Sequence, residues 1–333
     1  MTTSIEWVQG ADGQRGDTWN PLSGCREISP GCTNCYAAVM ASRLEAMMVE
    51  KYQGTTRKLD NGKVVWTGKI NLDEASLLKP LRTKKPTTYF VNSMSDLFHE
   101  DVPDSFIDRV FAVMALCPQH TFQVLTKREE RMQQYFSTYR KSGIAPSLSV
   151  TFKDMPDGGT LIAPLDNVWL GVSVEDQQRA SERILFLLRT PAAVRFLSCE
   201  PLLGSVNIEP FLQYEPFHEN YKMTFGAREW RGVDWVIVGG ESGHGARPCR
   251  IEWVRSIVEQ CQAAAVPVFV KQLGSHVIGN MSERMAMIGE PVNRGDDSIV
   301  RWKLRDKKGG DMAEWPQYLR VRQFPEQKAS VTG

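Results

Sequence analysis

Three cysteines close to the N-terminus are the residues whose type and spacing indicate chemistry. Cys25, Cys32 and Cys35 follow the pattern C-x6-C-x2-C, so three of the seven cysteines lie within eleven residues. Two thiolates two residues apart can bind one metal centre, and the turn-forming residues 29–31 can fold the third back toward it. Without a fourth thiol nearby, an iron–sulfur cluster would keep one iron open to an outside ligand. The spacing is also compatible with zinc, or with no metal at all.

The composition is that of an ordinary folded protein. With 333 residues, of which 42% are hydrophobic and 24% charged, the chain can form two average domains or a single α/β barrel. The net charge of +1 gives no strong overall attraction to polyanions, so nucleic acid would have to bind at local basic patches. The sequence shows neither a signal peptide nor an apolar run of membrane-spanning length, so we expect a cytoplasmic protein with no membrane partner and reduced cysteines.

Short apolar runs alternate with amphipathic segments along most of the chain. After a first extended segment that ends at Trp19, apolar runs cover residues 87–96, 121–128, 168–176, 193–200, 235–242 and 266–272. This alternation predicts parallel βα units, and therefore an α/β fold that is a partial or full (β/α) barrel of about six or seven parallel strands. We place the barrel and its cysteine loop in residues 1–275, with insertions at 137–167 and 205–232, and a C-terminal cap in residues 276–333.

Two smaller elements are expected between the cysteines and the second strand. Residues 37–52 have helical spacing, with charged residues on one side and an apolar side that carries Val39, Met40, Leu44, Met47 and Met48. The pair Asn61-Gly62 lies between two potential strands and predicts a β-hairpin over residues 58–66.

Every apolar run stops at polar, charged or small residues. In a β/α barrel the carboxyl ends of the strands meet at one mouth, where active sites are built. The cysteines follow the first strand, so we expect them at the same mouth. Contact with solvent is the usual explanation for any single polar strand end. The residues that follow the later strands are Ser93, Ser95, Asp96, Lys127, Arg128, Glu175, Cys199, Glu200, Glu241 and Lys271.

The cysteine trio after the first strand of a β/α array, ending in Cys-x-x-Cys-Tyr, resembles the motif of the radical S-adenosylmethionine superfamily. The usual spacing in that superfamily is C-x3-C-x2-C, so the first gap is longer here. The chain is more closely similar to a phage-associated three-cysteine-motif family that is labelled a domain of unknown function. The similar segments are residues 18–35, 90–100, 122–128, 168–175, 196–202, 236–243 and 270–272.

The resemblance implies a cofactor and a reaction. Cys25, Cys32 and Cys35 would bind three irons of a 4Fe–4S cluster, and the fourth iron would bind the amino and carboxylate groups of S-adenosylmethionine. Reduction by a donor such as flavodoxin or ferredoxin would cleave the sulfonium and give a 5′-deoxyadenosyl radical that abstracts hydrogen from the substrate. The resemblance thus implies a lyase or base-modifying enzyme that acts on a nucleic-acid base or nucleotide, in repair or hypermodification.

Two other functions stay open on the sequence. One is a non-catalytic barrel, stabilised by zinc or a cluster, that binds a nucleotide or another partner. The other is a cluster protein that only transfers electrons. Cleavage of S-adenosylmethionine distinguishes the enzyme from both.

The resemblance also implies roles for the residues that would hold the cofactor. The superfamily binds the methionine amino group with Gly-Gly-Glu after the second strand, where this chain has Asn-Ser-Met-Ser-Asp at 92–96. We therefore expect Ser93, Ser95 and Asp96 to take that role. Lys127, with its neighbour Arg128, would meet a carboxylate or phosphate.

Further roles are implied at the later strands. Glu175 would accept the ribose hydroxyls, although it could equally be a charge in the first turn of the next helix. Cys199 would return a hydrogen atom to a product radical, with a buried and inert thiol as the alternative. Glu241 and Lys271 would bind the substrate.

Overall fold

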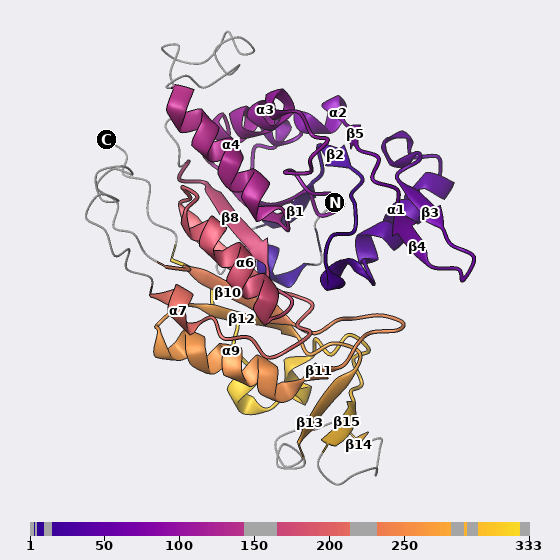
Figure 1. The fold of residues 1–333 in the computed structure, drawn as a ribbon, viewed down its shortest axis with the longest axis vertical. Coiled ribbons are helices and arrows are strands. Elements are labelled where there is room, and N and C mark those ends of the chain that lie inside the picture. The colour runs from indigo at the N-terminus through magenta and orange to yellow at the C-terminus, as the bar shows by residue number, and fades with distance from the viewer. Residues whose placement is uncertain are drawn as a thin grey trace. The chain divides into compact units, whose positions relative to one another are not determined.

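The computed structural model describes residues 3, 5–9, 15–142, 165–213, 232–280, 290–291 and 299–326. Most of the two expected insertions therefore lies outside the described residues. The chain divides into two compact units, Met1–Val172 with Arg189–Ala193, and Ser173–Leu188 with Val194–Gly333. Figure 1 labels many of the helices and strands of both.

Four parallel strands form the centre of the first unit. In β6 every residue is buried, as expected for a strand with neighbours on both sides and cover on both faces. Register pairs Trp19 with Val91 and Val91 with Val124, so the carboxyl ends of the first three strands lie side by side. These strands are β1 (Arg15–Trp19), β6 (Thr87–Val91), β7 (Thr121–Thr126) and β8 (Val168–Ser173), followed in the chain by α3 (Asp104–Ala115) after β6 and α4 (Glu129–Ser142) after β7.

A lobe between β1 and β6 carries the cysteines. It contains the expected hairpin, β3 (Thr56–Lys58) with β4 (Val64–Trp66). Its helix α1 (Tyr36–Ala46) is shorter than predicted, because Met48 takes a φ of 61° and the chain turns away. The remaining elements are β2 (Leu22–Ser23) paired with β5 (Asn71–Leu72), α2 (Glu74–Leu77), and the short 3-10 turns η2 (Pro30–Cys32), η3 (Glu50–Tyr52) and η4 (Pro80–Arg82), with η1 (Glu6–Val8) before β1.

The second unit repeats the βα rhythm with three parallel strands. Phe196, Trp235 and Phe269 come one from each strand, and their rings pack in series together with Phe324. The strands are β9 (Val194–Cys199), β10 (Trp235–Gly239) and β12 (Val268–Gln272), and the helices are α6 (Gln177–Leu188), α7 (Glu209–Leu212) and α9 (Ile251–Ala263).

The C-terminal part of the second unit adds a small sheet and an edge segment. The sheet has the order β11 (Cys249–Arg250), β13 (Val277–Asn280), β15 (Ile299–Lys303), β14 (Glu290–Pro291). After the turns η7 (Met312–Glu314) and η8 (Gln317–Leu319), the chain pairs with β12 through the Val270 N–H to Val321 O bond and the Gln323 N–H to Val268 O bond. The outer edge of β12 is therefore covered.

Seven parallel strands follow the order β1-β6-β7-β8-β9-β10-β12. The expectation of an α/β fold of the partial β/α barrel type, with about six or seven parallel strands, is confirmed. None of the described helices has the length and apolar character needed to cross a membrane.

Candidate functional site

The cysteine loop is held at the carboxyl end of β1 by backbone contacts. Gly24 has a φ of 96°, and a Cβ there would lie 2.0 Å from the carbonyl oxygen of Lys69, so this close approach needs glycine. Gly24 also bridges to Ser95, which follows β6. The carbonyl of Cys25 accepts the N–H of Gly68 at 3.2 Å. These contacts fix the backbone on both sides of Cys25.

The other two cysteines lie where the loop becomes helix. Cys32 ends the 3-10 turn η2, and its Sγ lies 3.6 Å from the hydroxyl of Ser29. Cys35 is the residue that caps the N-terminus of α1. The positive end of the helix dipole favours a negative charge there, such as a ligating thiolate.

Exposure separates these three cysteines from the rest. All seven cysteines are free thiols; Cys25, Cys32 and Cys35 are partly exposed, whereas Cys117, Cys199, Cys249 and Cys261 are buried. Burial raises the pKa of the Cys25 thiol to about 12, Arg128 counteracts this, and Asp96, Cys35 and Cys32 raise it further. The trio therefore shares one neighbourhood, in which Arg128 favours the thiolate form of Cys25.

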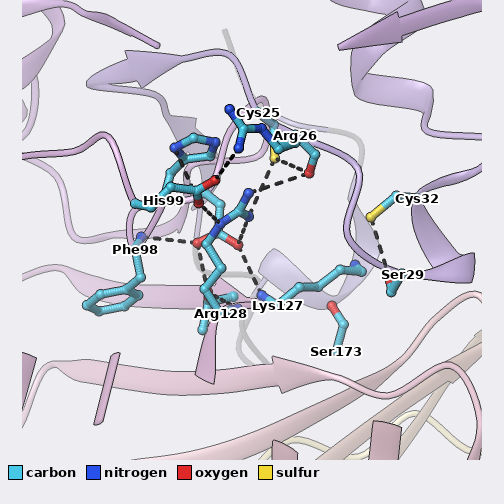
Figure 2. Close-up of polar contacts among 12 residues, drawn as sticks. Cys25, Arg26, Ser29, Cys32, Phe98, His99, Lys127, Arg128 and Ser173 are labelled. Carbon is cyan, nitrogen blue, oxygen red and sulfur yellow. Dashed lines mark hydrogen bonds and ion pairs between the residues drawn. The ribbon is translucent and has the colours of Figure 1, made fainter. Parts of the chain in front are cut away.

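Arg128 supplies a positive charge beside Cys25, as Figure 2 shows. Its Nη1 lies 3.7 Å from the Cys25 Sγ and 3.1 Å from Asp96 Oδ2, and its Nε donates to Glu100 Oε2 at 3.0 Å. The side chains of Arg128 and Asp96 are only 8% and 7% exposed. The two carboxylates fix the guanidinium, and the nitrogen that bonds Asp96 also faces the sulfur of Cys25.

Asp96 joins the end of β6 to the end of β7. Its carboxylate accepts the Thr126 hydroxyl at 2.7 Å, the Lys127 N–H at 3.0 Å and the Phe98 N–H at 3.1 Å, besides the bond from Arg128. Asp96 thus serves the geometry of the site, and its expected contact with a methionine amino group stays a prediction.

Ser93 and Ser95 hold the loop after β1. The Ser93 hydroxyl lies 3.2 Å from Asn20 Oδ1, which also accepts the Met94 N–H, and the Ser95 hydroxyl donates to the Leu22 carbonyl at 3.0 Å. The predicted set Ser93, Ser95, Asp96 and Lys127 is therefore brought together with the cysteine loop. Their contact with S-adenosylmethionine stays a prediction.

Glu100, Arg26 and His99 complete the surroundings and were not predicted as site residues. Arg26 pairs with Glu100 at 3.1 Å. Burial lowers the pKa of His99, its Nδ1 accepts the Asp101 N–H, and within the described residues its buried Nε2 has no partner. The only signal in the sequence was their place, directly after a cysteine or a few residues beyond a strand end.

In the second unit Glu175 forms a buried ion pair. Its Oε2 lies 2.7 Å from Arg183 Nη1 of α6, and the side chains of Glu175 and Arg183 are 0% and 4% exposed. The same nitrogen donates to the Ser173 carbonyl. The pair joins α6 to the segment before it; Glu175 lies two residues before the helix begins and not in its first turn, and its contact with the ribose hydroxyls stays a prediction.

Cys199 ends β9, whereas Lys271 lies in β12, on the other side of β10, and the residue beside Lys271 is Glu200. Lys271 Nζ lies 3.1 Å from Glu200 Oε1, and the Ser198 hydroxyl lies 3.5 Å from Glu200 Oε2. Cys199 is 0% exposed, and burial first and Cys261 of α9 next raise the pKa of its thiol. Since side chains alternate along a strand, Ser198 and Glu200 share a face that Cys199 does not.

Glu241 shapes the loop after β10. It accepts two bonds from the Arg247 guanidinium, at 2.6 and 3.0 Å, and a third from the Arg247 N–H at 2.9 Å. This bidentate pair closes residues 241–247 into a loop. A role for Glu241 in substrate binding stays a prediction.

Among the described residues, which include all three cysteines of the loop, no three Cys, His, Asp or Glu side chains are placed to hold one metal ion. The cluster therefore stays a prediction from the sequence.

Comparison with known proteins gives a family and a distant structural likeness. A search of curated proteins finds no match. A solved structure of spore photoproduct lyase complexed with dinucleoside spore photoproduct is 9% identical with a TM-score of 0.34, over 91% of this chain and 72% of that one. A likeness this weak supports no transfer of activity. The model of the family described as protein of unknown function (DUF5131) matches residues 2–309. The chain therefore belongs to that family of proteins of unknown function.

Proposed function

We propose that this chain is an iron–sulfur enzyme of the radical S-adenosylmethionine type. The observation that carries the proposal is the cysteine loop. Its three free, partly exposed thiols lie within eleven residues at the carboxyl end of the first parallel strand, beside the buried guanidinium of Arg128. The α/β fold with seven parallel strands supports it.

The residues of the first unit would divide the work of holding the cofactors. Cys25, Cys32 and Cys35 would ligate a 4Fe–4S cluster, and Arg128 would offset the negative charge that three thiolates bring. We assign four residues to the binding of S-adenosylmethionine, because they follow the neighbouring strands β6 and β7. They are Ser93, Ser95, Asp96 and Lys127. When bound and reduced, the cluster supplies the electron that cleaves S-adenosylmethionine to methionine and a 5′-deoxyadenosyl radical.

For the second unit we propose contact with the substrate. Glu200 after β9 and Lys271 of β12 form a partly exposed pair, 14% and 24% exposed, at strands that lie on either side of β10. Such a pair can exchange its internal contact for bonds to a polar substrate. Glu241, held by Arg247, would position the loop that follows β10.

A nucleic acid or nucleotide is the substrate class that the charges favour. Arg301, Lys303, Arg305, Lys307 and Lys308 are all exposed on β15 and the following turn. Within the described residues none of them forms an ion pair. Arg301, Lys303 and Lys307 line a cavity of about 420 Å³ together with Ser275. Phosphates bind to such patches, and the binding weakens steeply with salt.

The cluster is tested on protein purified without oxygen. Iron and sulfide content and the visible spectrum are measured for the natural sequence, Cys32→Ala and Cys117→Ala. The last variant is the matched control, because Cys117 is a buried cysteine outside the trio. We expect about four irons per chain in the natural protein and the control, and their loss in Cys32→Ala.

The reaction is tested on the same samples. With dithionite and S-adenosylmethionine, the loaded protein should release 5′-deoxyadenosine and methionine, and Cys32→Ala should release neither. A colourless protein with one zinc would overturn the proposal in favour of a binding module. A loaded protein that neither binds nor cleaves S-adenosylmethionine would indicate electron transfer instead.

The basic patch is tested by the salt dependence of binding to single-stranded and duplex oligonucleotides. Replacing Arg301, Lys303 and Lys307 with glutamine should reduce the slope of log K against log salt by about two to three units. The control replaces Arg57 and Lys58, two exposed cations of the other unit. Equal slopes for the two variants would exclude the patch.

A further inference from the structure

Helix α1 turns its small residues inward and its large apolar residues outward. Ala37, Ala38 and Ala41 are at most 6% exposed, whereas Tyr36 is 63% and Met40 42% exposed. The inner side packs on Tyr52 and Met94. The apolar side that the sequence suggested is thus largely the outer side, because alanines suffice to fill the narrow space beneath the helix.

The outward residues lie close together in the sequence. We call Tyr36, Val39, Met40, Met47 and Met48 the apolar stripe. Positions 36, 40 and 47 fall on one side of a helix, and 39 lies next to them. Single exposed apolar residues are common, but five of the ten large ones on the described surface lie within these thirteen residues.

Met48, at the C-terminal end of the stripe, is exposed although its backbone conformation is unfavourable for methionine. Met48 has a φ of 61° in the position after the helix where glycine is favoured. Its side chain is 81% exposed and packs little. A methionine here has a conformational cost that glycine would avoid, without any gain from burial.

The stripe adjoins the proposed cluster and lies in a basic segment. It begins at Tyr36, directly after Cys35, and the Tyr36 hydroxyl donates to the Ser93 carbonyl at 3.0 Å. Arg26 and Lys51 are paired with Glu100 and Asp73, but Arg43, Arg57 and Lys58 are exposed and form no ion pair among the described residues. This segment would therefore attract an acidic partner.

We propose that the apolar stripe is the docking surface for an acidic one-electron donor protein that reduces the cluster. This inference rests on the proposed function. One electron passes from donor to cluster, and no bond is made or broken. Methionines adapt to different partners, and transient redox complexes use small interfaces. Five side chains are too few for a stable dimer, which needs about 20–30 residues from each partner.

The test uses an acidic flavodoxin as the probe. Its affinity for the full-length protein is measured by calorimetry at low and physiological salt. The rate at which reduced flavodoxin reduces the cluster is compared with the rate at which dithionite reduces it. The variants are Met40→Glu with Met47→Glu, and Met48→Gly. The control is Ile299→Glu, since Ile299 is exposed to the same 42% as Met40 but lies in the other unit.

We expect the double variant to bind flavodoxin at least tenfold more weakly and to be reduced by it correspondingly more slowly, with the dithionite rate unchanged. Met48→Gly should weaken binding about two- to threefold while leaving thermal stability equal or higher, which separates docking from folding. Ile299→Glu should match the natural protein.

Flavodoxin affinity that is absent in the natural protein, or equal in the double variant, would overturn the inference. So would a dimer in sedimentation that the double variant dissociates, because a second copy would then cover the stripe. Iron content of the same samples reports on the proposed function separately, and binding of flavodoxin is measured whether or not the cluster is present.

Discussion

Arg128 is a buried cation shared by Asp96, Glu100 and Cys25. Removing one member of a buried ion pair leaves the other charge without compensation, at a cost of about 3–5 kcal/mol. Arg128→Met should therefore lower the free energy of unfolding by roughly that amount in urea denaturation. Arg131→Met is the control, because Arg131 pairs with Asp104 at the surface, where such pairs contribute about 0–1 kcal/mol. Equal losses in the two variants would contradict the burial argument.

Replacing Glu175 tests whether its carboxylate binds the cofactor or only stabilises the fold. Its carboxylate is fully buried against Arg183. We expect Glu175→Gln to destabilise the protein by about 3–5 kcal/mol, because the amide cannot balance the charge of the buried guanidinium. The Kd for S-adenosylmethionine, corrected for the fraction of protein that is unfolded, should stay the same. A Kd that rises tenfold with unchanged stability would support the ribose role.

The elements could be predicted because their periodicity is local. The runs at 87–96, 121–128, 168–176, 193–200, 235–242 and 266–272 became β6, β7, β8, β9, β10 and β12. The outward face of α1 could not be predicted. Either its methionines or its alanines could form the buried side of the helix. Which of them is buried depends on how closely Tyr52 and Met94 approach the helix.

The candidate site was predictable in part for the same reason. The cysteine trio and the polar strand ends are visible as residue types at fixed places. The partners are not, because Arg128 meets Cys25 across 103 residues and Lys271 meets Glu200 rather than Cys199. Such pairings depend on strand register and side-chain alternation, which no local pattern contains.

His120 ties η4 to the start of β6 and makes this connection sensitive to acid. Its Nδ1 accepts the Thr87 N–H at 3.2 Å, and its Nε2 lies 3.0 Å from the Thr83 carbonyl. Burial lowers the pKa of His120 below 6.5, although bonds to Pro80 and Thr83 act in the opposite direction. The unfolded chain then binds the proton more readily, so stability is lost as the pH falls from 6.5 toward the folded pKa.

The measurement is urea unfolding at pH 7.5 and 5.5. His120→Asn keeps an acceptor in a similar place but does not titrate. It should be less stable than the natural protein at pH 7.5 and should lose less stability on acidification. Parallel losses in both proteins would show that other groups carry the pH dependence.

At the scale of the whole molecule, the segment after residue 311 belongs to the core of the second unit. Trp315 and Leu319 are fully buried, and residues 321–323 pair with β12. Leu319→Ala should cost about 2–5 kcal/mol. Gln317→Ala, at an exposed position two residues earlier, should cost less than about 0.5 kcal/mol. Thermal unfolding compares the two, and a mild effect at Leu319 would identify the segment as a removable appendage.

The long span between Cys25 and Arg128 has a consequence for biosynthesis. Arg128 lies 93 residues after Cys35, the last cysteine of the trio. At about 5–20 residues per second, a ribosome needs roughly 5–20 s to make that stretch. During this interval the nascent chain displays three thiols before β7 can deliver the guanidinium. A cluster delivered at that stage would meet a site that still lacks its arginine, so insertion after translation is the favoured order of events.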